Sequence, residues 1–525
     1  MISKSYSNLS PKRGWSWETP PEKIAEEKIL ETLTADVVII GAGISGLAAA
    51  ARCTQRGLNT IVLDRLSNLF VRVAQVGVLD SAVMRRCGVS IDKKKFARDW
   101  VMVSGSRCNE ELMWVYIKRS GEAFDWMMDQ GGDAVDATLY TGYYKGEVFN
   151  EYPGTHWVFQ KDGYNRYTNR KGGQLIGEIL QKTVIDGGSR IIRSVRAVEL
   201  EKNADGRVTS VVAKNENEGT YFRCVAKKGV IVATGDIEGD REMMEAFAPQ
   251  ALRPTIERYF PKGNNTGDGH KMLYWAGAAL ESPGWAIALH GRRDEYASYY
   301  SFYFLFVNSR GKRFMNEDTW TNGKSMAVLS QPGGDFAFTI MDGKWLDEFG
   351  ERFEITGGQA VMPLNLTYFG DKWTKDCGLG EEIEQYVEKG KCAWKADTIE
   401  ELAEKIGVPA DTLTKTVARY NELAERGDDE DFGKRAELLT TIVQPPFYAL
   451  KWGPALLDVF GGALVDTNMR VLDPYHEPIP GLYAVGNAAG GFCGIDYPLL
   501  LNGNSSGRAL TCALTVTEGI EADNR

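Results

Sequence analysis

The sequence predicts an α/β fold built on a parallel, Rossmann-like sheet, because three apolar runs each end in a glycine turn. The first run, 36–40, leads directly into GAGISG at 41–46. The second run lies within GVIVATG at 229–235, and the third lies within GLYAVGN at 481–487. Short apolar runs that end in glycine turns are typical of buried strands in such a sheet.

The turn after the first run carries a dinucleotide fingerprint. Gly41 allows a tight turn, Gly43 lets the backbone approach a pyrophosphate, and Gly46 lets the following helix lie close to the strand. The N-terminus of that helix offers free N–H groups to the phosphates. A further apolar run, 60–63, ends in Asp64, whose carboxylate can accept a hydrogen bond from a ribose hydroxyl. The fingerprint alone leaves NAD and FAD equally possible.

Composition and net charge limit the classes of partner that the chain can bind. A chain of 525 residues with 43% hydrophobic and 25% charged residues is long enough for two or three globular domains. Its net charge of −10 argues against nucleic acid or an anionic membrane as a partner. No apolar run approaches the ~20 residues of a membrane span. The eight cysteines form no CxxC pair and the four histidines no HxxxH pair, so we expect no metal site.

The N-terminal residues 1–24 contain no apolar core of a secretory signal and no paired arginines. Scattered cysteines in a chain of this size fit a reducing compartment. We therefore expect a cytoplasmic protein, with an exported chain that has lost its signal as the alternative.

The remaining patterns predict elements along the chain. We expect an irregular arm at 1–33 and a glycine-punctuated segment near the cofactor at 71–81. The other expected elements are a helix at 109–130, loops at 136–169, a helix at 172–184, hairpin strands at 191–201 and 208–214, a helix opened by NTGDG (265–269), a strand, turn and strand at 306–317, an amphipathic helix at 411–424, a solvated acidic loop at 427–432 and a closing helix after Asn504.

Six segments match one family in one order. They are GAGISG with Asp64, VIVATGD (230–236), NTGDG (265–269), VNSRGKRFMNE (307–317), TVARYNELAERGDDEDFG (416–433) and IPGLYAVGNAAGG (479–491). Together they resemble the flavoprotein of the fumarate reductase and succinate dehydrogenase superfamily, which also includes urocanate reductases and 3-ketosteroid dehydrogenases. The resemblance covers roughly residues 33–520.

The resemblance implies a fold and a cofactor. The fold would be a two-dinucleotide-binding-domain (Rossmann-like) FAD domain, made of residues 33–300 and 456–525, with an inserted α+β capping domain at 301–455 and an N-terminal arm at 1–32. FAD, bound non-covalently, would exchange a hydride between flavin N5 and a substrate carbon. The residues expected to hold FAD are Gly41, Gly43, Ile44, Ser45, Gly46, Asp64, Arg65, Val76, Gly77, Val195, Ala233, Thr234, Gly235, Asp268, Gly486, Asn487, Asn502, Asn504 and Ser505.

The chain departs from the fumarate-binding pattern at the cationic positions. The family's VHHTMGG corresponds to 455–461, where Leu457 and Asp458 replace the histidine pair. The family's clamping arginine is replaced by Tyr497, and the segment 340–345 contains no catalytic arginine. A carboxylate substrate would be repelled by Asp458. Fumarate, succinate and urocanate are therefore poor candidate substrates.

A hydride can move onto a C=C bond when a conjugated group takes up the developing negative charge. Tyr497 could donate a hydrogen bond to a neutral carbonyl in this role, and 3-ketosteroid dehydrogenases have a tyrosine at the same position. The alternative for Tyr497 is a buried tyrosine with a satisfied hydroxyl. The expected substrate is a neutral, hydrophobic small molecule, steroid- or polyphenol-like. Its pocket could be lined by Leu456, Leu457, Leu499, Leu500, Leu501 and the tyrosines of 296–303, although core packing explains any single leucine equally simply.

Proton delivery has several candidates. Glu317 occupies the family's proton-relay position, with a structural salt bridge as its alternative. The aromatic segment offers further acids, and they are Tyr296, Tyr299, Tyr300 and Tyr303, of which we favour Tyr300 and Tyr303. His270 and His290 are expected to be structural.

Rival functions are weaker. GNSSG at 503–507 matches the hydrolase motif GxSxG, but no histidine follows Ser505. A non-enzymatic flavin sensor is the other class. Among enzymes we favour a reductase, with 3-ketosteroid dehydrogenation and, less so, dicarboxylate reduction as alternatives. Since haem and iron–sulfur spacings are absent, the electron donor is expected to be NAD(P)H, a free flavin or a separate carrier.

Overall fold

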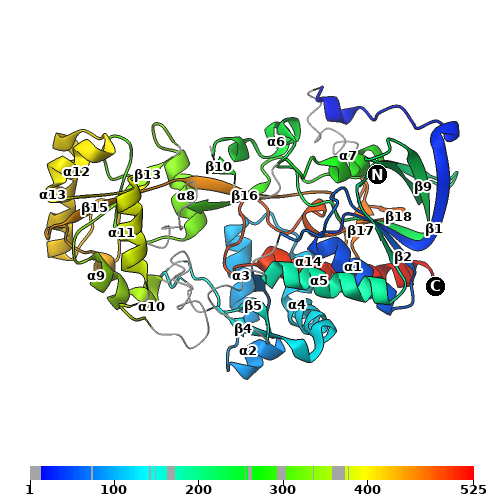
Figure 1. The fold of residues 1–525 in the computed structure, drawn as a ribbon, viewed down its shortest axis with the longest axis horizontal. Coiled ribbons are helices and arrows are strands. Elements are labelled where there is room, and N and C mark those ends of the chain that lie inside the picture. The colour runs from blue at the N-terminus through cyan, green and yellow to red at the C-terminus, as the bar shows by residue number, and fades with distance from the viewer. Residues whose placement is uncertain are drawn as a thin grey trace.

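The computed structural model describes residues 14–72, 75–140, 144–147, 149–161, 172–254, 256–257, 263–291, 303–334, 336–356, 373–376 and 378–525. Figure 1 shows an elongated molecule with two lobes. Both ends of the chain lie in one lobe, and the middle of the chain forms the other. No helix in the described part of the chain is long and apolar enough to cross a membrane.

The largest sheet has eight strands, in the order β17-β18-β9-β1-β2-β6, with β8 and β7 added beside β9. β1 (Ile29–Ile40) pairs in parallel with β2 (Thr60–Leu63) and with β9 (Tyr221–Val232). On its other side β9 pairs in parallel with β18 (Pro478–Ala484). The remaining strands are β6 (Arg190–Ile192), β7 (Val195–Lys202), β8 (Val208–Asn215) and β17 (Arg470–Leu472). The three glycine-ended runs are thus neighbouring parallel strands, and the predicted α/β fold class is confirmed.

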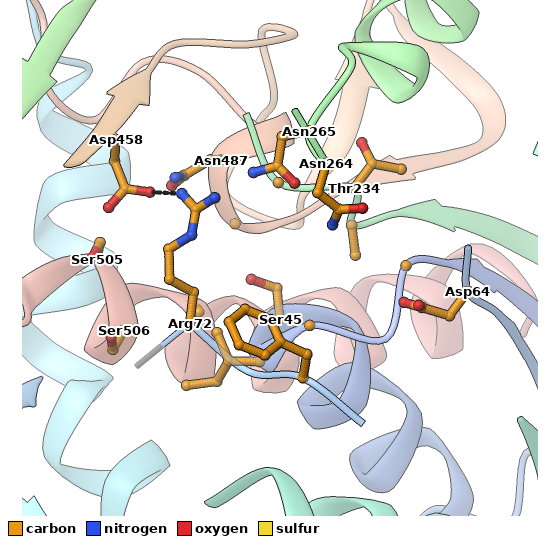
Figure 2. Close-up of a pocket in the computed structure, with 18 of the residues that line it drawn as sticks. Ser45, Asp64, Arg72, Thr234, Asn264, Asn265, Asp458, Asn487, Ser505 and Ser506 are labelled. Atoms are coloured by element: carbon orange, nitrogen blue, oxygen red, sulfur yellow. Dashed lines mark hydrogen bonds and ion pairs between the residues drawn. The ribbon is translucent and has the colours of Figure 1, made fainter. Parts of the chain in front are cut away.

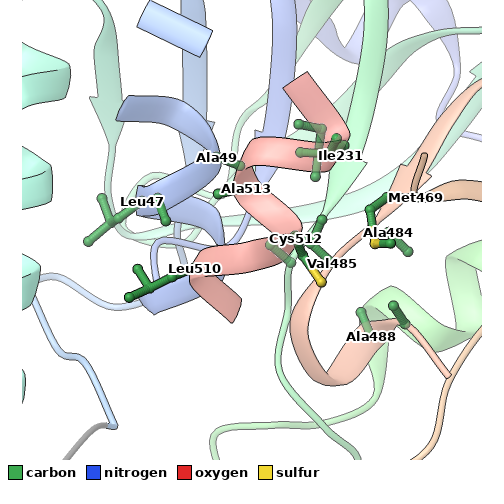
Figure 3. Close-up of a cluster of buried hydrophobic side chains, with 14 of the residues drawn as sticks. Leu47, Ala49, Ile231, Met469, Ala484, Val485, Ala488, Leu510, Cys512 and Ala513 are labelled. Atoms are coloured by element: carbon green, nitrogen blue, oxygen red, sulfur yellow. The ribbon is translucent and has the colours of Figure 1, made fainter. Parts of the chain in front are cut away.

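Two helices pack against each other on this sheet. α14 (Asn504–Asp523) lies between α1 (Ile44–Gln55) and α4 (Glu110–Gly131), and every residue from Ser506 to Thr517 is buried. Small side chains allow the close contact, and Figure 3 shows Ala49 of α1 beside Ala513 of α14. The other helices of this lobe are α2 (Ala82–Arg86), α3 (Lys93–Val103), α5 (Gly172–Asp186), α6 (Arg241–Phe247) and α7 (Asp268–Trp275). A helix that is buried on all sides, as α14 is over this stretch, must carry mainly apolar or small side chains on every face.

Two three-stranded sheets accompany the large one. One has the order β3-β5-β4 and the other β10-β16-β11. Their strands are β3 (Val76–Gly77), β4 (Val135–Leu139), β5 (Thr155–Gln160), β10 (Ile256–Glu257), β11 (Ala286–Gly291) and β16 (Pro454–Phe460). The prediction of loops throughout 136–169 is therefore wrong at β4 and β5. These two strands pair with each other, and the aromatic and glycine-rich stretch between them hid their alternation.

The second lobe contains a four-stranded sheet, β12-β13-β15-β14. Its strands are β12 (Leu305–Val307), β13 (Ala337–Met341), β14 (Ala393–Ala396) and β15 (Phe447–Trp452), and its helices are α8 (Thr321–Leu329), α9 (Trp345–Glu351), α10 (Phe353–Thr356), α11 (Leu379–Lys389), α12 (Ile399–Ile406) and α13 (Ala410–Arg426). Both faces of the sheet are covered, because Ile340 and Met341 point into different apolar clusters. The predicted capping boundaries, 301 and 455, bracket this sheet, and the division into domains stays a prediction.

Three local predictions need correction. The strand expected at 191–201 is divided between β6 and β7, because Ser194 has a positive φ of 57° that interrupts the extended chain. The second strand expected within 306–317 is reduced to one bridge, Val307 with Arg313. The arm expected up to residue 33 ends earlier, because β1 begins at Ile29.

The N-terminal arm is anchored by Trp17. Its ring packs against Phe247 and Tyr274 at centroid distances of 5.4 and 5.3 Å. The indole N–H of Trp275 donates to the Trp17 carbonyl at 2.8 Å. Only the short turns Ser16–Glu18 and Glu26–Lys28 are helical in its described part. The arm therefore gains its order from side-chain contacts with the sheet lobe.

A buried ion-pair network ties the loop after α13 to the segment after β12. Arg313 donates to both oxygens of Asp429, at 2.8 and 2.7 Å, and also pairs with Glu317 at 2.9 Å. The side chain of Asp429 is 0% exposed, so the prediction of a solvated loop at 427–432 is wrong at this residue. Burial raises the pKa of Asp429, but the hydrogen bonds from Arg313 and from the backbone N–H of Lys434, together with the charge of Arg313, outweigh burial and leave the pKa lowered.

Replacing Asp429 by asparagine is expected to lower the free energy of unfolding by about 3–5 kcal/mol, because it leaves buried Arg313 short of a charge partner. Urea unfolding of the wild type and of Asp429→Asn measures the difference. Glu430→Gln, in the same loop but exposed, is the matched control and should change little. Since the folded-state pKa of Asp429 is lowered, its contribution is present above about pH 4 and is lost as the pH falls further. Equal midpoints for the two variants would contradict this role.

Candidate functional site

A cavity opens at the carboxyl ends of β1, β9 and β18, where ligands bind in open α/β sheets. Figure 2 shows Asp64 at one end of the cavity and Asp458 with Ser505 at the other. Eleven of the residues predicted to hold a dinucleotide line it, and they are Gly41, Gly43, Ile44, Ser45, Asp64, Ala233, Thr234, Gly235, Gly486, Asn487 and Ser505. The sequence motifs thus converge on one place.

The fingerprint glycines have different structural roles. A Cβ on Gly41 would lie 2.4 Å from the carbonyl oxygen of Ala233, and a Cβ on Gly46 would lie 1.9 Å from the oxygen of Gly41. These two glycines permit the close packing of β1, α1 and β9. No atom lies within 4 Å of a Cβ built on Gly43, which faces the cavity. Gly43 therefore keeps space for a ligand.

Asp64 is fixed by backbone donors. Its Oδ2 accepts from the N–H of Ala42 at 2.5 Å, and its Oδ1 accepts from the N–H of Leu66 at 2.8 Å. Burial raises the pKa of Asp64 more than these two hydrogen bonds lower it. Each carboxylate oxygen can accept a second hydrogen bond, so the side chain can also bind a ribose hydroxyl.

A second pocket adjoins the cavity beside Asp64 and is lined by the predicted residues Arg65, Val195 and Asp268. The carboxylate of Asp268 pairs with Arg196 at 2.8 Å, and Arg65 donates to the side chain of Asn264 at 2.6 Å. The base end of a dinucleotide would enter this pocket, since it lies beyond the ribose-binding carboxylate.

Five predicted residues line neither the cavity nor the second pocket, and they are Gly46, Val76, Gly77, Asn502 and Asn504. Gly77 instead packs on the start of α14, where a Cβ would lie 2.5 Å from the oxygen of Asn502. The amide of Asn504 donates to the carbonyls of Pro498 and Leu501 at 2.9 and 3.0 Å. These residues hold the N-terminus of α14 in position.

Sequence reasoning missed several lining residues, and they are Leu66, Phe70, Arg72, Asn264 and Ala509. Arg72 lies in the segment that was expected near the cofactor, but no spacing marks this arginine. The signal that could have found it is the charge of Asp458, which needs a cationic partner when buried.

Arg72 holds three carboxylates at the far end of the cavity. Its Nη1 lies 2.7 Å from Oδ1 of Asp458 and 3.7 Å from Oδ2 of Asp236, and its Nη2 donates to Glu238. Burial raises the pKa of Asp458 to about 6 although Arg72 lowers it, and burial also raises the pKa of Asp236. The cluster therefore places three carboxyl groups around one guanidinium group at this end of the cavity.

Tyr497 lies in the core beside this cluster. Its ring stacks on Phe460 at a centroid distance of 4.3 Å and an interplanar angle of 8°. The hydroxyl oxygen accepts from the backbone N–H of Ser505 at 3.3 Å. Burial raises the pKa of Tyr497, as does the charge of nearby Asp458. Tyr497 itself does not line the cavity, but Ser505 does.

Two of the predicted proton donors, Glu317 and Tyr303, lie in the second lobe. Glu317 is 0% exposed and is paired with Arg313 and Lys434 at 2.9 and 3.2 Å, contacts that favour the salt-bridge alternative. The hydroxyl of Tyr303 donates to the carbonyl of Glu348 at 2.8 Å, inside an apolar cluster. Tyr296, Tyr299 and Tyr300 lie outside the described residues.

The other side chains singled out from the sequence are part of the packing. Leu456, Leu499, Leu500 and Leu501 are buried in apolar clusters, and Leu457 is partly buried. His270 is buried, with Nε2 lying 3.2 Å from the carbonyls of Gly461 and Asn487. Burial lowers the pKa of His270, so its ring stays neutral.

The cavity fits a dinucleotide with phosphates. Gly43 caps α1 without a side-chain hydrogen bond, which leaves the first N–H groups of the helix available to an anion. The hydroxyl of Thr234, a lining residue, is buried without a partner in the described part of the chain. Buried polar atoms of this kind usually have a partner, which a bound cofactor would supply.

A model of the family described as "FAD binding domain" matches residues 36–499. A vinyl phenol reductase of Lactiplantibacillus plantarum is 27% identical and is aligned over 90% of this chain and 94% of its own. A fumarate reductase (cytochrome) of Shewanella frigidimarina is 26% identical, over 91% and 75%. Among solved structures, 3-ketosteroid-Δ4-(5α)-dehydrogenase from Rhodococcus jostii RHA1 has a TM-score of 0.73 at 24% identity, over 96% and 100%. At that identity, the structural likeness supports the fold alone.

Gly43→Ala is expected to fold and to bind FAD roughly ten- to a hundredfold more weakly, because the added methyl group displaces a charged phosphate from its N–H donors. Its φ of −73° suits alanine. Gly46→Ala is the matched comparison and should lower the melting temperature of the apoprotein, because its methyl group meets backbone. Fluorescence titration of apoprotein with FAD and thermal unfolding measure the two effects. Unchanged FAD affinity in Gly43→Ala would refute the assignment.

Proposed function

The chain belongs to the FAD-binding family whose model matches residues 36–499, and it is an FAD-dependent oxidoreductase that acts on CH–CH or C=C bonds. We propose that it reduces a C=C bond conjugated to a carbonyl in a neutral, hydrophobic small molecule. Steroid-like and polyphenol-like compounds are the proposed classes. FAD, when bound, supplies the hydride-transferring ring, and the residues of the chain bind, orient and protonate the substrate.

The charge around Arg72 is the observation that carries this proposal. Arg72 is the one cation among the described residues that line the cavity, and three carboxylates surround it. A dicarboxylate would meet Asp458 there instead of the histidines of fumarate reductases. Like charges at short range are strongly unfavourable where water is excluded. A neutral substrate avoids this repulsion.

Tyr497 is the proposed donor to the substrate carbonyl. The hydroxyl oxygen accepts from the N–H of Ser505, and the hydroxyl also hydrogen-bonds the side chain of Ser505. In the proposed mechanism its proton is donated to the substrate oxyanion instead. Because burial raises the pKa of Tyr497, the hydroxyl stays protonated at neutral pH. A fixed donor of this kind stabilises the charge that develops on the carbonyl oxygen in the transition state.

We propose that FAD is bound without a covalent link. A covalent link needs a nucleophilic side chain at the flavin ring. The described residues that line the cavity include no histidine, cysteine or tyrosine. The proposed electron donor is NAD(P)H, a free flavin or a separate carrier.

Two similar proteins support a neutral substrate, whereas others are named for fumarate, urocanate or acrylate. The vinyl phenol reductase acts, by its name, on an uncharged conjugated molecule. The steroid dehydrogenase structure was determined with 4-androstene-3,17-dione, and desaturation of a 3-ketosteroid is the second candidate function because Tyr497 replaces the clamping arginine. Dicarboxylate reduction, suggested by likeness to fumarate reductases, is the third.

The direction of the reaction can be tested with the flavin colour under anaerobic conditions. Reduced enzyme mixed with enones should regain the oxidised flavin spectrum, while saturated ketones should not bleach oxidised enzyme. If saturated ketones bleach the oxidised flavin and enones do not reoxidise the reduced flavin, the dehydrogenase function would be favoured over the reductase function.

Tyr497→Phe is expected to retain FAD and to lower kcat about 10²–10³-fold, because one hydrogen-bond donor to the developing oxyanion is removed. Steady-state turnover measures kcat, and the bound-flavin spectrum measures the retention of FAD. Tyr448→Phe is the control, since Tyr448 hydrogen-bonds Glu384 in the other lobe and its loss should leave kcat unchanged. Full turnover by Tyr497→Phe would remove Tyr497 from the mechanism.

A further inference from the structure

The Arg72–Asp458 pair lies at the end of the cavity opposite Asp64 (Figure 2). Asp64 suits the ribose of the adenosine half, and the N-terminus of α1 suits the pyrophosphate. The remaining part of the cofactor, its ring, must then extend toward Arg72 and Asp458. Groups at this end are positioned to meet a substrate that reacts at the ring.

The three carboxylates around Arg72 differ in what they present to the cavity. The side chains of Asp236 and Glu238 are 1% and 0% exposed, whereas that of Asp458 is 16% exposed. Both oxygens of Asp236 are used within the fold, by the amide of Asn265 at 2.9 Å and by the N–H of Val459 at 3.1 Å. Asp458 is therefore the carboxylate that faces the cavity.

Asp458 retains acceptor capacity. Its Oδ1 is bonded to Arg72, and its Oδ2 has no hydrogen-bond partner among the described residues. An ionised carboxylate can only accept hydrogen bonds. Its partner must then be a donor, and hydrogen bonds to charged acceptors are stronger than those between neutral groups.

We propose that Asp458, held by Arg72, accepts a hydrogen bond from a hydroxyl group of the substrate. The site would therefore select a phenol or other hydroxyl compound over its methyl ether, which has no donor, and over its carboxylate, which adds a like charge. This inference rests on the proposed function, because it concerns the same site. It assigns Asp458 as a specificity-determining residue and Arg72 as a positioning residue.

The test uses three inert aromatic ketones that differ at one position, namely 4-hydroxyacetophenone, 4-methoxyacetophenone and 4-acetylbenzoate. None has a reducible C=C bond, so binding can be followed by the change in flavin absorbance of the FAD-loaded enzyme. The wild type should bind the hydroxyl compound roughly ten- to a hundredfold more tightly than the methoxy compound, and the carboxylate most weakly. In Asp458→Asn the acceptor is neutral and its NH2 group can donate to the methoxy oxygen, so the preference for hydroxyl over methoxy should fall below about threefold, and the carboxylate should bind more tightly.

Glu238→Gln is the matched control. Glu238 pairs with the same arginine but does not line the cavity, so its loss removes the same charge while leaving the hydroxyl preference unchanged.

The pH dependence of the hydroxyl preference in the wild type is a second test. The charged groups around Asp458 are Arg72, Asp236, Arg508 and, through Arg72, Glu238. As the pH falls below about 6, protonation of Asp458 should weaken the preference, and this holds even if Asp458→Asn fails to retain FAD.

Equal binding of the hydroxyl and methoxy compounds by the wild type would overturn the inference and leave the proposed function standing. A preference that survives in Asp458→Asn, or that vanishes equally in Glu238→Gln, would overturn it as well. Absence of any spectral change with all three compounds would also overturn the inference, whereas failure of enones to reoxidise the reduced flavin would contradict the proposed function itself.

Discussion

The close approach of the β1–α1 turn to the end of β9 is the constraint on which the cofactor lobe depends. At Gly41 and Gly46 the nearest neighbours of an added side chain are backbone oxygens, at 2.4 and 1.9 Å. Because both neighbours are backbone, no change of rotamer relieves the contact. The same approach directs the first N–H groups of α1 into the cavity, so one packing requirement also creates the phosphate site.

A second backbone contact brings the end of the chain to the same place. A Cβ on Gly503 would lie 2.5 Å from the oxygen of Gln75, and one on Gly507 would lie 1.9 Å from the oxygen of Gly77. The N-terminus of α14 is thereby held against the segment that carries Arg72. Burial of α14 between α1 and α4 supplies the apolar contact area that stabilises this arrangement. The two halves of the site, near residues 72 and 505, are positioned relative to each other by close backbone contacts at glycines, together with the hydrogen bonds of the Asn504 amide.

The sequence could predict what depends on neighbours along the chain. The glycine turn, the strand before it and Asp64 form one local unit, and their positions in the fold follow from it. Asp429 could not be recognised as buried, because its partner Arg313 lies 116 residues away. The strands β4 and β5 were missed because tyrosine and glycine residues between them hide the alternation. Arg72 gave no local signal, because its role arises only when the fold brings three acidic side chains to it.

Arg72 and Asp458 are 386 residues apart in the sequence, and each supplies the opposite charge that the other needs in this part of the cavity. A carboxylate alone in this part of the cavity would lose its hydration without compensation. An arginine alone would bind anions, which the two buried carboxylates Asp236 and Glu238 oppose. The resemblance to fumarate reductases implies that Asp458 stands where they have a histidine, so in the proposed site a substrate meets a carboxylate in place of a cationic clamp. Since breaking a buried ion pair leaves an unpaired charge, conversion of this site into a dicarboxylate site requires coordinated changes in both segments of the chain.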